Sequence, residues 1–115
     1  EEQQIKKLEG VDFSKINNNL IKAKIHEFFA DILNNSDRWS ESKDNYLKAL
    51  KLSNSQFYSA ILKFKLSQVV FNEGDFERAS KYIEEALKYD FQNQSIVKKI
   101  EILKGMIGQA KLRTS

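Results

Sequence analysis

The residues with the clearest capacity for chemistry are the only histidine, His26, and the nearby carboxylates Glu27 and Asp31. Glu27 and Asp31 lie about one helical turn apart, so they would share one face of a helix. Acid–base catalysis or metal binding needs several such groups to converge, and the chain has no HExxH, CxxC or carboxylate-rich loop. We therefore predict a surface or packing role for His26 and a solvated carboxylate pair. An acidic contact for a basic partner is the alternative for Glu27 and Asp31.

Other catalytic patterns are missing from the sequence as well. No serine stands in a strand–turn–helix elbow of the kind that activates a nucleophile. The glycines, at positions 10, 74, 105 and 108, do not form a phosphate-binding loop. There is no cysteine, so disulfide and thiol chemistry are excluded. We predict a protein that is not an enzyme and that holds neither a cofactor nor a metal.

The composition favours one helical domain over residues 1–115. Hydrophobic residues make up 41% of the 115 residues, which is enough for a continuous core. The absence of proline and the presence of only four glycines disfavour an all-β fold, which needs frequent turns. No apolar run approaches the roughly 20 residues of a membrane span. A cysteine-free chain suits the cytoplasm and the periplasm equally, so the compartment stays open.

The charge is too evenly distributed to indicate a nucleic-acid partner. The chain has 19 Lys and Arg against 16 Asp and Glu, a formal charge of +3, without a long block of one sign. Lys98, Lys104 and Lys111 do not share one helical face, and no aromatic side chains alternate with them. We interpret these lysines as a solvated face.

Helix signals follow one another along the chain with short connections. Gly74 can adopt the positive φ that ends a helix, and Asp75 can cap the next one. A short helix in EEQQIKKLEG is expected to stop at Gly10, before Ser14 starts a longer helix. The remaining pattern predicts helices near residues 15–34, 38–52, 56–72, 75–89 and 94–111.

Residue types recur at a constant spacing of 37 positions. Trp39, Ser42, Tyr46, Ala49, Leu50 and Lys51 precede Phe76, Ala79, Ile83, Ala86, Leu87 and Lys88 by this offset, and Phe29, Ala30 and Leu33 align in the same way on Leu66, Ser67 and Val70. A constant offset over nine positions indicates an internal repeat of two helical hairpins.

The stretch GDFERASKYIEEALKYD resembles the turn and second helix of a tetratricopeptide repeat. The resemblance covers one copy over residues 23–56 and another over 60–93, with Asp37 at the glycine position of the first copy and Phe91 where the family has proline. It implies hairpins stacked as a short right-handed solenoid, with residues 1–22 as an extension and 94–111 as a capping helix. It also implies a scaffold that binds a protein or peptide in a concave groove.

The helix predicted over residues 56–72 has two apolar arcs. One arc, which includes Leu62, Leu66 and Val69, is expected to be core. On the family's geometry the other arc lines the groove, as do the positions of Glu27 and Asp31. The predicted partner-contacting residues are Ile61, Phe64, Gln68, Phe71, Glu27, Asp31 and Lys98. Two alternatives stay open: residues 1–13 fold back over this surface, or a second copy binds it as a homodimer.

Overall fold

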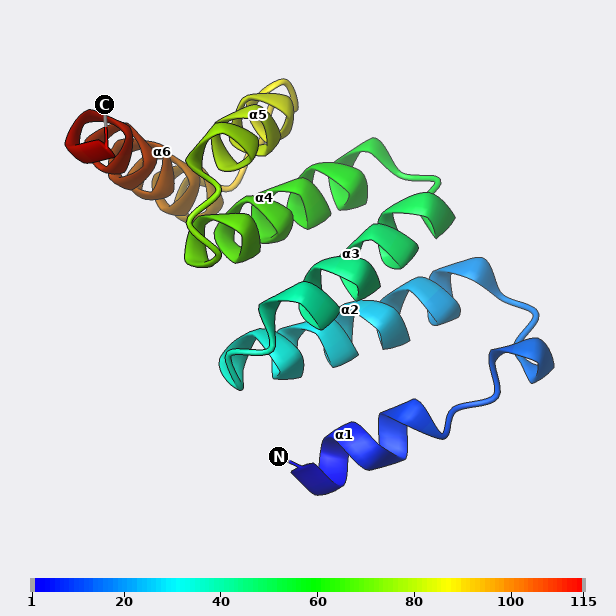
Figure 1. Cartoon of the computed structure of the whole chain (residues 1–115). Helices are drawn as coiled ribbons and strands as arrows, with labels where there is room; N and C mark the ends of the chain where they lie inside the picture. Colours follow the sequence, from blue (N-terminus) through cyan, green and yellow to red (C-terminus); the bar gives the residue numbers. More distant parts are fainter. Residues whose placement is uncertain (1, 115) are drawn as a thin grey trace. The chain divides into compact units, whose positions relative to one another are not determined.

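The structure is a computed structural model that describes residues 2–114, and this part of the chain contains helices and no strands (Figure 1). The all-α prediction is confirmed. The elements are α1 (Glu2–Glu9), the 3-10 turn η1 (Phe13–Lys15), α2 (Asn19–Asn35), α3 (Trp39–Leu52), α4 (Gln56–Asn72), α5 (Phe76–Leu87) and α6 (Gln94–Thr114).

One predicted helix start is wrong. Ser14 does not begin the long helix, because the Asp12 side chain accepts hydrogen bonds from the Ser14 backbone and hydroxyl and closes the short turn η1 instead. The long helix α2 begins at Asn19, and the Asn18 side chain caps it by accepting the Ile21 N–H at 3.0 Å. The side-chain caps thus belong to two separate elements, and Asn18 marks the start of the long helix.

The chain divides into two compact units, the first ending at Asn54 and the second beginning at Ser55. In the first unit, α2 and α3 form a hairpin and α1 packs on α2. Ile5 and Leu8 of α1 contact an apolar cluster on α2 made of Phe29, Ile32 and Leu33. In the second unit, α4 and α5 form a hairpin, and α6 packs mainly on α5 and also on α4.

The first helices of the two hairpins share their bounds and the way they are capped. α2 and α4 each span 17 residues, and both of their ends are related by the 37-residue offset. The Ser55 side chain caps α4 by accepting the Tyr58 N–H at 3.1 Å, as Asn18 does for α2. The spacing found in the sequence is therefore a structural repeat.

The turns repeat as well. Gly74 has φ +85°, and Asp37, at the same place in the first hairpin, has φ +59°. Aspartate tolerates this left-handed region better than most side chains do, so it can replace glycine here. The N–H groups of Arg38 and Asp75 donate to the carbonyls of Leu33 and Val70, both at 2.9 Å. The two turns thus have the same hydrogen-bonded geometry.

Within each hairpin the helices meet at one alanine and one serine. In the first hairpin the Ser42 hydroxyl of α3 donates to the Ala30 carbonyl of α2 at 2.7 Å. In the second hairpin the Ser67 hydroxyl of α4 donates to the Ala79 carbonyl of α5 at 2.8 Å. All four residues are fully buried. Small side chains at these positions let the paired helices approach closely, and the serine can stand on either helix.

We predict that Ala49→Leu and Ala86→Leu each destabilise the protein. Both alanines are fully buried, so a larger side chain must push neighbouring groups apart at a cost of about 1–3 kcal/mol. Chemical denaturation measures the free energy of unfolding. Lys51→Leu, an exposed position on α3, is the control and should change stability little. Leucine variants at the alanines that are as stable as the parent would contradict the packing described here.

Candidate functional site

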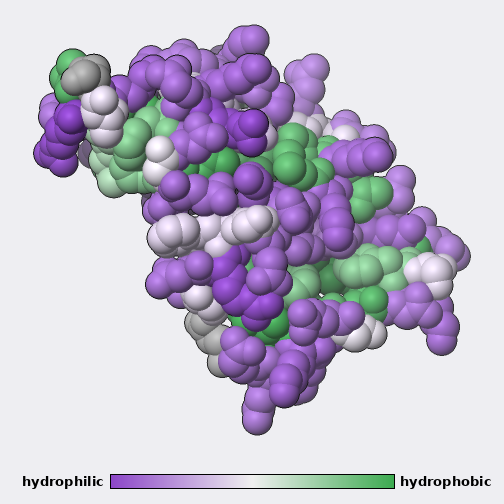
Figure 2. Space-filling view, in the orientation of Figure 1, coloured by the Kyte–Doolittle hydropathy of each residue, from purple (hydrophilic) through white to green (hydrophobic). Residues whose placement is uncertain are grey.

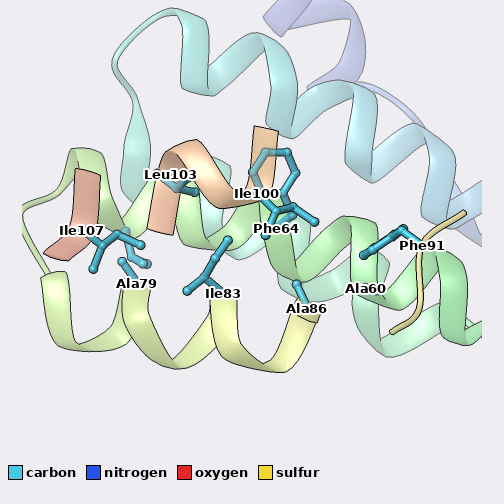
Figure 3. Close-up of a cluster of buried hydrophobic side chains, with 10 residues drawn as sticks. Ala60, Phe64, Ala79, Ile83, Ala86, Phe91, Ile100, Leu103 and Ile107 are labelled. Carbon is cyan, nitrogen blue, oxygen red and sulfur yellow. The ribbon is translucent and has the colours of Figure 1, made fainter. Parts of the chain in front are cut away.

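The apolar face of α4 that the sequence suggested as a groove is largely covered by α6. Phe64 is only 8% exposed and belongs to a buried cluster that includes Ile100, Leu103 and Ile107 of α6. Figure 3 shows Phe64 beside Ile100, with Ile83 of α5 below them. Phe64 is therefore a core residue of the second unit and does not line an open groove. The sequence pattern identified its arc as apolar but could not show which segment packs against it.

The buried residues packed around Phe64 all belong to the second unit. Ile5 and Leu8 pack on α2 in the first unit, whereas the cluster around Phe64 is formed by residues of α4, α5, α6 and the segment between α5 and α6. Within the second unit, the cover of Phe64 comes from α6.

A narrower surface remains on this side of α4, which we call the α4 edge: Phe57, Ile61, Gln68 and Phe71. Phe57 is 45% exposed, and Ile61, Gln68 and Phe71 are half-buried. Their spacing places all four on one side of the helix. Ile61 and Phe71 also pack against the buried cluster, and the Phe71 ring lies 5.4 Å from the Phe76 ring, centre to centre. The α4 edge is thus a partly exposed apolar surface whose side chains Ile61 and Phe71 pack against the core.

Aromatic contacts fix the first turn of α4 against the loop that leads to α6. The Phe57 ring packs edgewise on Tyr89 at 5.6 Å and on Phe91 at 5.9 Å, and Tyr89 and Phe91 lie 4.9 Å apart. Phe91, which stands where the resembling family has proline, is buried. An aromatic anchor therefore holds this loop in place of a stiff proline.

Glu27 and Asp31 lie in the first unit and are engaged within the chain. Glu27 is mostly buried and pairs with Lys24 at 3.6 Å. Asp31 accepts a hydrogen bond from the hydroxyl of Tyr46, a buried residue of α3. Burial, followed by this bond to Asp31, raises the pKa of Tyr46 above its ordinary value. Asp31 therefore takes part in the α2–α3 packing and Glu27 pairs within α2, so the prediction of a solvated pair is wrong.

His26 has a structural environment, in agreement with the packing role considered for it. Asn45 donates its amide to the Glu41 carbonyl at 3.0 Å, which turns its side-chain oxygen toward His26 Nδ1, also at 3.0 Å. Nδ1 therefore carries the proton of the neutral ring. Phe13 stacks on the imidazole, with ring centres 4.2 Å apart. Burial lowers the pKa of His26, the Asn45 bond opposes this shift and the charge of Lys48 adds to it.

Lys98 is exposed on α6. It is not part of the α4 edge or of the buried cluster. The seven predicted partner residues are distributed over both units. Two lie in the first unit, Phe64 lies in the core, and three lie on the α4 edge. Phe57 belongs to that edge and was not predicted as a site residue. Whether any of them binds a partner stays a prediction.

Residues 2–114 contain no group of three or more His, Asp or Glu side chains placed to hold a metal ion. In the same part of the chain no helix has both the length and the apolar character that crossing a bilayer requires. No protein-family model matches the sequence, and no curated protein matches it either. The tetratricopeptide resemblance stays a prediction from the residues.

We predict that Phe64→Ala lowers the free energy of unfolding by about 3 kcal/mol or more, because it leaves a cavity beneath α6. Phe28→Ala is a matched control, since Phe28 is 53% exposed on α2 and should cost little. Urea denaturation of both variants gives the comparison. Equal stability of Phe64→Ala and the parent would contradict the cover by α6.

The lowered pKa of His26 predicts a pH-dependent stability. Because the unfolded chain binds the proton at the ordinary pKa of 6.5 and the folded chain only at lower pH, acidification through 6.5 favours unfolding. The free energy of unfolding should therefore fall between about pH 7.5 and 5.5, above the range in which carboxylates titrate. His26→Gln should remove that part of the slope. If the free energy of unfolding of His26→Gln changed with pH as steeply as that of the parent, the pH dependence would belong to another group.

Proposed function

We propose that this chain is a non-enzymatic protein-interaction module made of tetratricopeptide-like hairpins, stacked as a short right-handed solenoid with α6 as its cap. The observation that carries the proposal is the recurrence of one hairpin design at an offset of 37 residues, with the same bounds of the first helix, the same turn geometry and the same alanine–serine contact. Repeated hairpins of this kind build extended surfaces suited to binding protein partners.

The α4 edge is the binding surface that we propose for a partner segment. It combines the exposed ring of Phe57 with the half-buried side chains of Ile61 and Phe71, while the Gln68 amide supplies a polar group that can orient a backbone. Because Ile61 and Phe71 are already packed from beneath, a partner would meet ordered side chains and lose little further conformational freedom. Phe64 contributes as part of the floor and not as a direct contact.

The proposal is tested by selecting peptides from a displayed random library on the immobilised chain. We expect selected peptides to lose about tenfold or more in affinity for Ile61→Asp, because the anchor at the α4 edge becomes charged. Lys81→Glu, an exposed change on α5, is the control and should leave affinity unchanged. Melting temperatures of both variants establish that they are folded.

Two outcomes would overturn this assignment. Selected peptides that bind Ile61→Asp as well as the parent would exclude the α4 edge as the site. Concentration-dependent dimerisation in light scattering that Ile61→Asp abolishes would show instead that a second copy of the chain occupies the edge.

A further inference from the structure

The side of α6 that points away from its own core carries exposed apolar side chains. Ile102 is 60% exposed, Met106 is 48% exposed and Leu112 is 72% exposed. At 100° per residue Ile102 and Leu112 lie on the side away from Ile100, Leu103 and Ile107, which pack into the buried cluster, and Met106 lies at the border between the two sides. We call the surface that includes Ile102, Met106 and Leu112 the outer face of α6. In Figure 2, hydrophobic surface is visible near the C-terminal end of the chain among hydrophilic side chains.

Helix α6 is also basic, although its one acidic residue, Glu101, is exposed on the outer side beside Gly105. Residues 94–114 contain five Lys and Arg against one Glu, so their charge of +4 exceeds the +3 of the whole chain. Lys104 and Lys111 face α5 and pair with Glu84 at 3.2 Å and with Glu77 at 3.3 Å. Within residues 2–114, the remaining three cations form no salt bridge. These are Lys98, Lys99 and Arg113, which are exposed and whose spacing places them around Ile102 and Met106.

Two glycines in the middle of α6 have no explanation inside the fold. A Cβ atom placed on Gly105 or Gly108 would meet nothing within 4 Å. Neither glycine has a positive φ. Glycine weakens a helix interior relative to alanine, so these residues reduce helix stability without any packing benefit within the chain. Residues that weaken their own helix are expected at positions where function requires them. Gly105 lies on the outer face, where it leaves room for another backbone to approach.

We infer that the outer face of α6 docks an acidic amphipathic helix of a partner protein. The three cations require acidic residues on the partner, and Ile102 and Met106 require apolar residues between them. A lipid surface with anionic headgroups would satisfy the charge, but it gains nothing from the space over Gly105 and would find no aromatic anchor on this face. A helix uses that space, because its backbone can lie against α6 at the glycine.

The geometry also limits the partner. Ile102 and Leu112 are ten residues apart, which is about 15 Å along α6, or about three turns of a docked helix. The partner helix needs apolar residues on one face for Ile102 and Met106, a small residue where it crosses Gly105, and Asp or Glu on both flanks. This surface is separate from the α4 edge, so the inference does not depend on the function proposed for that edge.

The test uses the full chain and a displayed library of helical peptides, selected on the parent and counter-selected on the folded variant Ile102→Asp. We expect enriched peptides to have acidic residues flanking an apolar face. They should lose about tenfold or more in affinity for Ile102→Asp and bind more weakly as salt is raised. Lys98→Glu should weaken them too. Lys81→Glu on α5 should not, although it changes the net charge equally.

Gly105→Ala separates a binding role from a structural one. Alanine should raise the melting temperature, since a Cβ at this position meets nothing and favours the helix. If the glycine admits a partner helix, the same change should weaken the selected peptides while it stabilises the chain. Stability and affinity that rise together, or an affinity that does not change, would overturn the role of Gly105 and with it the close helix docking.

Three further results would overturn the proposal. Selection that yields no acidic amphipathic peptides, or peptides that bind Ile102→Asp and the parent equally, excludes the outer face as their site. In a second result, the chain sediments with vesicles that contain phosphatidylserine and not with vesicles of phosphatidylcholine alone. If Ile102→Asp abolished this sedimentation, the occupant would be a membrane. Dimerisation in sedimentation equilibrium that Ile102→Asp abolishes would identify a second copy.

Discussion

The structure of each hairpin depends on the close approach of two helices at a buried alanine and serine. Ser42 bonds to the Ala30 carbonyl in one hairpin and Ser67 to the Ala79 carbonyl in the other, so the hydroxyl crosses the same gap from opposite sides. A hydroxyl is one of the few polar groups small enough for such a contact, and the bond to a carbonyl satisfies it in the core. Larger side chains at these four positions would separate the helices and remove the packing of the residues above and below.

Close pairing of α4 and α5 also determines which surfaces remain for a partner. Because α5 presents Ala79 and Ala86 to its neighbours, α6 can approach and complete the cluster around Phe64, Ile83 and Ile100. That cluster includes Ala60, Phe64 and Val70 of α4. The α4 edge and the outer face of α6 are left on different sides of the same packed core, so both are held by residues that also stabilise the fold.

Much of the fold follows from local signals in the sequence. Gly74 and Asp75 mark a turn, and the 37-residue spacing predicts the matching turn in the first hairpin even though Asp37 replaces glycine there. The start of α2 was placed wrongly at Ser14, because a serine is a good helix cap by type and the sequence does not show that Asp12 closes a short 3-10 turn there while Asn18 caps α2.

The candidate site was predicted less well, since burial depends on segments far apart in the chain. The apolar character of Phe64 was evident, but its cover comes from Ile100 and its neighbours on α6, more than 30 residues later. Likewise, the sequence pattern of Asp31 is that of a solvated residue, but Tyr46 of α3 donates a hydrogen bond to it. Asn45 of the same helix forms a hydrogen bond with His26. Periodicity shows which side of a helix is apolar or charged, and it does not show what packs on that side.

The central claim is that the two hairpins are one design in which the serine can stand on either helix. It is tested most directly by exchanging the pair in the second hairpin, Ser67→Ala with Ala79→Ser, and by comparing its free energy of unfolding with that of Ser67→Ala alone. The single change should cost about 1 kcal/mol through loss of the hydroxyl–carbonyl bond. The exchange should restore most of this loss, because a serine at position 79 occupies the place that Ser42 has in the first hairpin. An exchanged variant no more stable than Ser67→Ala would contradict the equivalence of the two hairpins.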